Sequence, residues 1–145
     1  MNRSSITTPW GISDDGGHVL APGITSYSTP SHGGIHLDAE RLAQFTAMFP
    51  NFEPFCKQAG WFEEDCDWAF VALCFPEAFR PEDIRIALRI AAWDKGSNFK
   101  AYEDWSETLY GRQMLGLAPT TATLLASHDH EALDDIDNRQ TVGKE

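Results

Sequence analysis

The segment that decides the fold reads Glu63-Glu64-Asp65-Cys66-Asp67-Trp68-Ala69-Phe70-Val71-Ala72-Leu73-Cys74-Phe75. Four of its first five residues are acidic, which suits the positive end of a helix dipole. The residues that follow are apolar on nearly all sides, a pattern typical of a helix buried in the centre of a core. We therefore predict a helix over residues 63–75, ended by Pro76, against which the rest of the domain packs.

Further helices are expected on both sides of this segment. Asp38 can cap a helix over residues 38–49, whose apolar residues recur at helical spacing. A short helix is predicted at residues 54–60, because Pro54 suits a first turn. Two more are expected over residues 81–94, where Gly96 follows as a plausible stop, and over residues 99–115.

The residues before Asp38 favour strands instead. Glycine and proline separate three short β-leaning pieces, residues 18–21, 23–28 and 34–37. Trp10 precedes the first of them and could anchor the N-terminus across the resulting sheet. The predicted fold class is therefore α+β, with a small N-terminal antiparallel sheet packed against four to five helices.

The C-terminal residues have a different composition. Residues 127–145 hold six acids and two bases, a net charge of −4, with few apolar side chains. Such a segment buries too little apolar surface to offset the entropy of ordering it. We expect one domain over residues 1–126, followed by a flexible acidic tail over residues 127–145.

Composition excludes several classes of function. The 145 residues include 22 acids and 11 bases, a formal charge of −11, which argues against gripping nucleic acid or an anionic membrane directly. The longest apolar run, residues 69–75, is far shorter than the roughly 20 residues that span a bilayer, and no signal peptide is recognised. Three cysteines form no even disulfide set, so a reducing cytoplasm is expected. No nucleotide-binding or cofactor motif occurs, and no cofactor is predicted.

Two residues could carry nucleophilic chemistry. His32, followed by Gly33 and Gly34, could act as a general base beside backbone amides, but the same glycines also suit a simple turn. Cys66 lies in the first turn of the predicted central helix, where the dipole favours a thiolate and the neighbouring acids oppose it. A Cys66–His32 pair is therefore one hypothesis, and a cysteine that only fills space is the other.

Histidines also raise the question of a metal site. His18, His32 and His36 would have to converge to bind one ion. In an extended strand, positions four apart share a face but lie about 13 Å from each other, too far for a common ligand sphere without a bend. We predict no metal site.

Three segments together carry a resemblance to a known family. They are Thr8-Pro9-Trp10-Gly11, Thr29-Pro30-Ser31-His32-Gly33-Gly34 and Gly60-Trp61-Phe62-Glu63-Glu64-Asp65-Cys66-Asp67-Trp68-Ala69. Over about residues 8–80 the chain resembles a domain of unknown function found in phages, prophages and plasmids. The resemblance implies a small accessory protein of a mobile element, a class that often inhibits host defence, including anti-CRISPR proteins. It implies no catalytic residues.

The preferred hypothesis is a binding protein that blocks a bacterial defence complex. Carboxylates on its surface would engage the Lys and Arg side chains with which a basic protein or nucleoprotein complex of the host cytoplasm holds nucleic acid. The predicted partner-binding residues are Glu63, Glu64, Asp65 and Asp67, followed by Asp134, Asp135 and Asp137 of the tail. The alternatives are a small hydrolase or transferase using His32 and Cys66, and a structural accessory protein with no inhibitory role.

Overall fold

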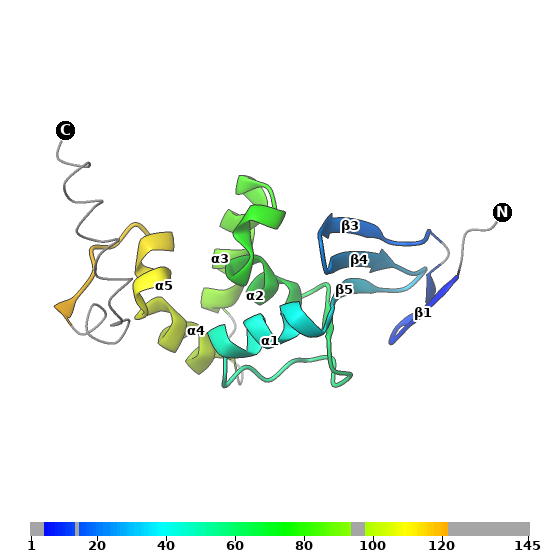
Figure 1. Ribbon diagram of the computed structural model, residues 1–145, viewed down its shortest axis with the longest axis horizontal. Coiled ribbons are helices and arrows are strands. Elements are labelled where there is room, and N and C mark those ends of the chain that lie inside the picture. Colours follow the sequence, from blue (N-terminus) through cyan, green and yellow to red (C-terminus); the bar gives the residue numbers. More distant parts are fainter. Residues whose placement is uncertain (1–4, 14, 94–97, 122–145) are drawn as a thin grey trace. The chain divides into compact units, whose positions relative to one another are not determined.

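The computed structural model describes residues 5–13, 15–93 and 98–121 (Figure 1). The chain divides into two compact units, residues 1–102 and 103–145. The described residues form two small antiparallel sheets and five α-helices, which confirms the predicted α+β class and the position of the sheet near the N-terminus. The expected boundary at residue 126 and the expected tail over residues 127–145 lie outside the described residues.

The strands belong to the first unit. A two-stranded hairpin is followed by a four-stranded sheet in the order β3-β4-β5-β6, with each neighbouring pair antiparallel. The three predicted strands are confirmed to within one residue at each end. The strands are β1 (Ile6–Thr8), β2 (Gly11–Ser13), β3 (His18–Ala21), β4 (Ile24–Ser28), β5 (Gly33–Leu37) and β6 (Trp61–Glu63).

The helices follow the expected order. Asp38 caps the first of them, with its Oδ1 accepting the backbone N–H of Arg41 at 2.9 Å. The helices are α1 (Ala39–Met48), α2 (Asp67–Cys74), the short 3₁₀ helix η1 (Pro76–Ala78), α3 (Pro81–Trp93), α4 (Phe99–Ser106) and α5 (Leu109–Met114).

The central helix is shorter than the sequence predicts. Residues 61–63 form strand β6, with Glu63 opposite Gly34 of β5, and α2 begins only at Asp67. The prediction of a helix from residue 63 was wrong because pairing with β5 keeps the chain extended there. The Glu63 carboxylate instead accepts the backbone N–H groups of residues 65–67. We call residues 63–67 the acidic turn.

Two other helix predictions need correction. Residues 54–60 form no helix, because the backbone N–H groups of Phe55 and Cys56 donate to the Asp67 carboxylate instead of to a helical ladder. The predicted helix over residues 99–115 is two helices. Thr108 separates them, since its Oγ1 donates to the carbonyl of Trp105 and accepts the backbone N–H of Gly111.

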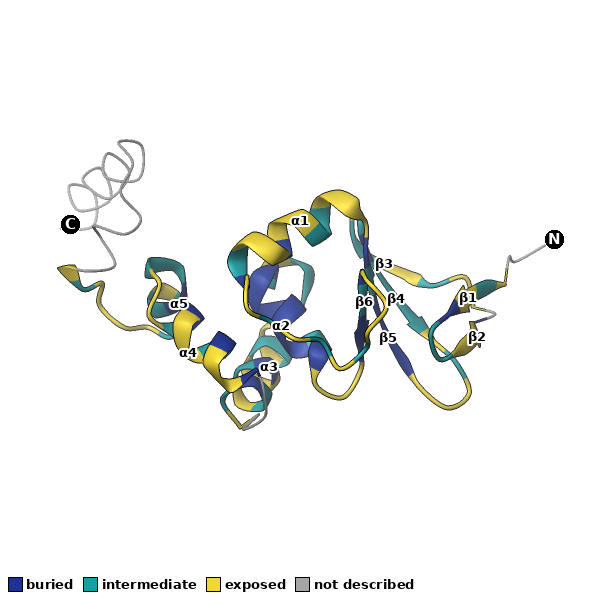
Figure 2. Ribbon diagram, turned by 90° about the horizontal axis from the view of Figure 1, so that it is seen from below, coloured by how far each residue is buried: buried dark blue, intermediate teal, exposed yellow. Residues whose placement is uncertain are grey.

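One face of the four-stranded sheet carries the core of the first unit. Strand alternation directs Ile24, Ile35 and Leu37 to the side on which α1 and α2 lie, and Figure 2 shows burial concentrated in α2 and the central strands. Phenylalanine rings join the layers at centroid separations of 4.8–5.3 Å. These rings belong to Phe45, Phe49, Phe52, Phe62 and Phe70.

The opposite face carries aromatic side chains and the β1–β2 hairpin. Trp61 contacts Trp10 edge to face at 5.8 Å, Tyr27 at 5.5 Å and His36 at 4.6 Å between ring centroids. A Cβ at Gly34 would collide with the Trp10 ring, so glycine lets the ring approach the sheet. The predicted anchoring of the N-terminus by Trp10 is confirmed.

Candidate functional site

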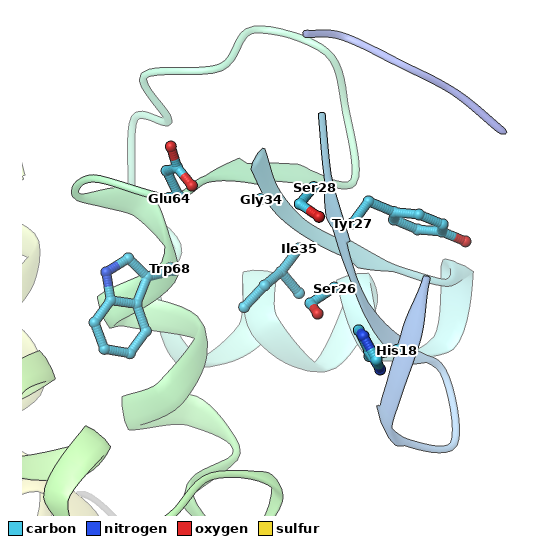
Figure 3. A pocket seen from close by; sticks show the side chains of 8 residues that line it. All are labelled: His18, Ser26, Tyr27, Ser28, Gly34, Ile35, Glu64 and Trp68. Carbon is cyan, nitrogen blue, oxygen red and sulfur yellow. The ribbon is translucent and has the colours of Figure 1, made fainter. Parts of the chain in front are cut away.

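A cavity of about 310 Å³ opens where the helix-facing side of the sheet extends past the first turn of α2. Figure 3 shows Ser26 and Ile35 on its floor, Glu64 and Trp68 on one side and His18 at the other end. The ring of Tyr27 points away from it. We call this space the α2 cavity. Its remaining lining residues are Ser28 and Gly34.

The position of Glu64 is set by the neighbouring strand. Its backbone N–H donates to the Gly33 carbonyl at 3.0 Å, which extends the contact between β5 and the acidic turn. A Cβ at Gly33 would lie 3.2 Å from Glu64 Oε1 and only 2.7 Å from the Tyr27 carbonyl oxygen. Glycine at position 33 therefore leaves room for the Glu64 carboxylate over the sheet.

The aromatic wall and the floor of the α2 cavity are also supported from behind. The Trp68 indole lies on Phe79, with ring centroids 6.2 Å apart. Ser28 Oγ donates to Asp15 Oδ2 at 3.1 Å, and hydrogen bonds from Ser13 and the Gly17 backbone lower the pKa of Asp15. A second carboxylate is thus hydrogen-bonded to a residue that lines the cavity.

The acidic turn is held by the carboxylate of Glu63. This side chain is 6% exposed and accepts the backbone N–H groups of Asp65, Cys66 and Asp67. These amides include the start of α2, where the first N–H groups have no partner within the helix. Glu63 therefore acts as the cap that the N-cap residue Cys66 does not itself provide through its side chain.

Asp67 ties the loop before β6 to α2. Its side chain is 1% exposed and accepts the backbone N–H groups of Phe55 at 2.9 Å, Cys56 at 3.0 Å and Glu63 at 3.4 Å. Burial raises the pKa of Asp67, and the nearby Glu63 charge raises it further, while the three N–H donors lower it. Burial is the largest of these effects, so the balance is upward.

The four predicted partner-binding acids of the acidic turn divide into two pairs. Glu63 and Asp67 are buried and accept backbone N–H groups, so they hold the turn and do not face solvent. Glu64 and Asp65 are exposed, and Glu64 also lines the α2 cavity. The weaker candidates Asp134, Asp135 and Asp137 lie outside the described residues.

The predicted His32–Cys66 pair is placed as follows. Both residues are exposed, and Cys66 is the N-cap of α2. The His32 ring lies beside Glu64, with 3.9 Å between Nδ1 and Oε2. Gly33 and Gly34 are part of strand β5. A side chain at either position would collide with a neighbouring group, the Tyr27 carbonyl oxygen at Gly33 and the Trp10 ring at Gly34, which explains why both are glycine. The enzyme hypothesis stays a prediction, and the glycines themselves need no catalytic role.

Two further properties concern the described residues alone. They contain no group of three or more His, Cys, Asp or Glu side chains placed to hold a metal ion, and none of their helices is long and apolar enough to cross a membrane. Burial raises the pKa of the Cys74 thiol to about 12, so this cysteine is a packed apolar residue.

Most residues of the α2 cavity carry no signal in the sequence that marks a site. Ser26 and Ser28 alternate along one strand and therefore share a face, a signal that was available but too common to indicate a site. In the sequence, His18 is considered as a possible metal ligand, and Trp68 as part of the predicted central helix. These residues come together because α2 begins at Asp67, beside the sheet. The predicted helix began four residues earlier, at residue 63.

The described residues have an α+β fold, with a cavity beside the central helix whose lining includes the Glu64 carboxylate. It belongs to the DUF7007 family, a domain of unknown function, whose family model matches residues 3–115. No match is found among curated proteins or among solved structures. The resemblance to an uncharacterised domain family is therefore confirmed, and the origin in phages, prophages and plasmids stays a prediction.

Proposed function

We propose that this protein is a binding protein that occupies a basic surface of its partner, with Glu64 and Asp65 at the contact. The supporting observation is that both side chains are exposed on a turn whose backbone is held by the buried carboxylates of Glu63 and Asp67. A turn fixed before binding loses little conformational entropy when it meets a partner. The formal charge of −11 adds long-range attraction toward a basic surface.

The proposed partner is a basic protein or nucleoprotein complex of a bacterial host, and specifically the nucleic-acid-binding site of a defence complex. Such a site holds phosphates with Lys and Arg side chains, which carboxylates can engage in their place. In this proposal the protein acts as an anti-CRISPR-like inhibitor encoded by a mobile element. It needs neither a cofactor nor direct contact with nucleic acid.

The experiment uses the full-length protein and a purified CRISPR effector complex. The inhibition of DNA cleavage is measured against protein concentration for the wild type, for the double variant Glu64→Gln/Asp65→Asn and for the control Glu40→Gln/Glu53→Gln. The control removes two exposed acids elsewhere and changes the net charge equally. We expect the first variant to inhibit roughly tenfold more weakly, because each exposed charge contributes up to about 1 kcal/mol.

Two results would contradict the proposal. A wild-type protein that leaves cleavage by a panel of such complexes unchanged removes the proposed partner class. Equal losses in the test and control variants would mean that net charge alone acts, without a specific contact at the acidic turn. A salt titration adds an independent check, since contacts between exposed charges weaken as ionic strength rises.

A further inference from the structure

We infer that the α2 cavity receives one arginine side chain of the partner. This inference rests on the proposed function, because it names the group that the partner places against Glu64. It goes further by assigning a defined pocket, a single residue type and an aromatic contact to an interaction otherwise described only by charge.

Two walls of the cavity carry groups that suit a guanidinium group, a carboxylate for its N–H edge and an aromatic ring for its flat face. Glu64 offers a carboxylate that accepts paired N–H donors, and Trp68 offers an aromatic wall on which a planar cation can stack. Glu64 lies in the acidic turn and Trp68 in the first turn of α2, and both stand on the same side of the cavity (Figure 3). Lysine could satisfy the charge, but it lacks the flat surface and the fixed fork of donors.

The charge around the cavity favours a cation over other occupants. Among the described residues that line it, none is a lysine or an arginine. Glu64 stands at its side, and Asp15, whose pKa is lowered by its hydrogen bonds, stands behind Ser28. An apolar occupant would cover the Glu64 carboxylate without a partner, which is unfavourable. An anion would meet the Glu64 carboxylate directly.

The cavity is also built before the partner arrives. Phe79 supports Trp68, and the Gly33 backbone holds Glu64 in place. The floor is the regular pairing of β4 with β5, with Ser26 opposite Ile35. A volume of about 310 Å³ is at the lower limit of small-molecule pockets, a size suited to one long side chain.

The first experiment needs no variant and no partner. Labelled full-length protein is titrated with Nα-acetyl-arginine amide while NMR follows the Trp68 indole N–H and the amides of Ser26 and Ile35. Nα-acetyl-citrulline amide has nearly the same shape without the charge, and Nα-acetyl-lysine amide has the charge without the planar group. We expect saturable shifts at these three positions with the arginine probe, and binding at least roughly fivefold weaker with the other two.

Variants then test the assignment of the walls. Glu64→Gln and Trp68→Leu should each weaken binding of the arginine probe by at least about fivefold. Glu40→Gln is the matched control, since it removes one exposed charge from α1 without touching the lining, and it should leave the affinity unchanged. Amide spectra of each variant report whether the fold is retained.

Several outcomes would overturn the inference. Equal binding of arginine and citrulline probes, tighter binding of the lysine probe, or shifts confined to residues outside the lining each remove the guanidinium site. If Trp68→Leu loses the probe but inhibits the effector complex as the wild type does, the cavity binds a free small cation and not the partner. In that case the proposed function stands. If cleavage is never inhibited while the probe binds as expected, the proposed function fails and the pocket remains.

Discussion

The acidic turn has an inner and an outer side that use the same residue types for opposite purposes. Glu63 and Asp67 are 6% and 1% exposed and together accept six backbone N–H groups, whereas the Glu64 side chain is 49% exposed and Asp65 is open to solvent. The difference shows that an acidic run in a sequence is not by itself an acidic surface. Half of these charges organise the chain, and the other half are available for binding.

The division follows from the geometry at the junction of β6 and α2. The chain leaves the sheet at Glu63 and turns sharply before the helix begins at Asp67. Amides without a secondary-structure partner gather at such a turn, and buried N–H groups require acceptors. The carboxylates at its two ends satisfy them, which makes the loss of either inner carboxylate more damaging than the loss of an outer one.

The largest expected effect is that of Asp67→Ala. The change leaves the amides of Phe55 and Cys56 without their acceptor, and it weakens the link between the loop before β6 and the central helix. We expect a loss of about 3 kcal/mol in the free energy of unfolding, since each buried group left without a hydrogen bond costs about 1–3 kcal/mol. Urea denaturation at neutral pH measures it. Asp65→Ala is the control, and a loss below about 1 kcal/mol would mean that water replaces the carboxylate.

Glu63→Ala should be the next most damaging change. It removes the acceptor for three amides at the start of α2, and loss of a helix cap typically costs about 1–2 kcal/mol. Glu63→Gln retains one carbonyl oxygen, so it should lose roughly half as much. Hydrogen exchange at residues 65–67 provides a local measurement. Unchanged exchange in Glu63→Ala would show that the carboxylate does not hold these amides.

The sequence predicts the strands and the start of the first helix better than it predicts the acidic turn. The alternation and glycine pattern identified β3, β4 and β5, and Asp38 identified the start of α1. The acidic residues before an apolar run also marked the start of the central helix, but local propensity placed that start at residue 63. Tertiary pairing of residues 61–63 with β5 prevailed over the local preference.

The candidate site was predictable in part. The acidic run predicted all four of its carboxylates as one contact surface, but only Glu64 and Asp65 are exposed, whereas Glu63 and Asp67 are buried. The neighbouring sequence does not distinguish the buried pair from the exposed pair. The buried carboxylates are those that accept backbone N–H groups, and one of these comes from Phe55, twelve residues before Asp67. The α2 cavity was out of reach for a similar reason, since its walls come from strands and a helix far apart in the sequence.

The pH dependence of the free energy of unfolding should report on the buried carboxyl group of Asp67. Because burial raises the pKa of Asp67 above its ordinary value of 3.8, the folded protein binds this proton more readily than the unfolded chain. The contribution of Asp67 therefore favours the folded state at low pH and is lost as pH rises through the raised pKa. In urea denaturation, the stability of the wild type relative to Asp67→Asn should fall as pH increases from about 4 toward neutrality. A relative stability that rises with pH over this range would contradict the sign.

The smallest expected effect is that of the outer carboxylates on folding. Glu64→Gln and Asp65→Asn should each change the free energy of unfolding by less than about 0.5 kcal/mol, since exposed side chains away from packed contacts contribute little. Among the described residues, His32 lies beside Glu64, with 3.9 Å between Nδ1 and Oε2 and both side chains about half exposed. A double-mutant cycle with His32→Gln should therefore give a coupling below about 0.5 kcal/mol. A larger coupling would mean that this pair also stabilises the turn. Glu64 would then belong with the inner carboxylates, and its loss of binding in the variant experiments would have to be separated from a loss of folding.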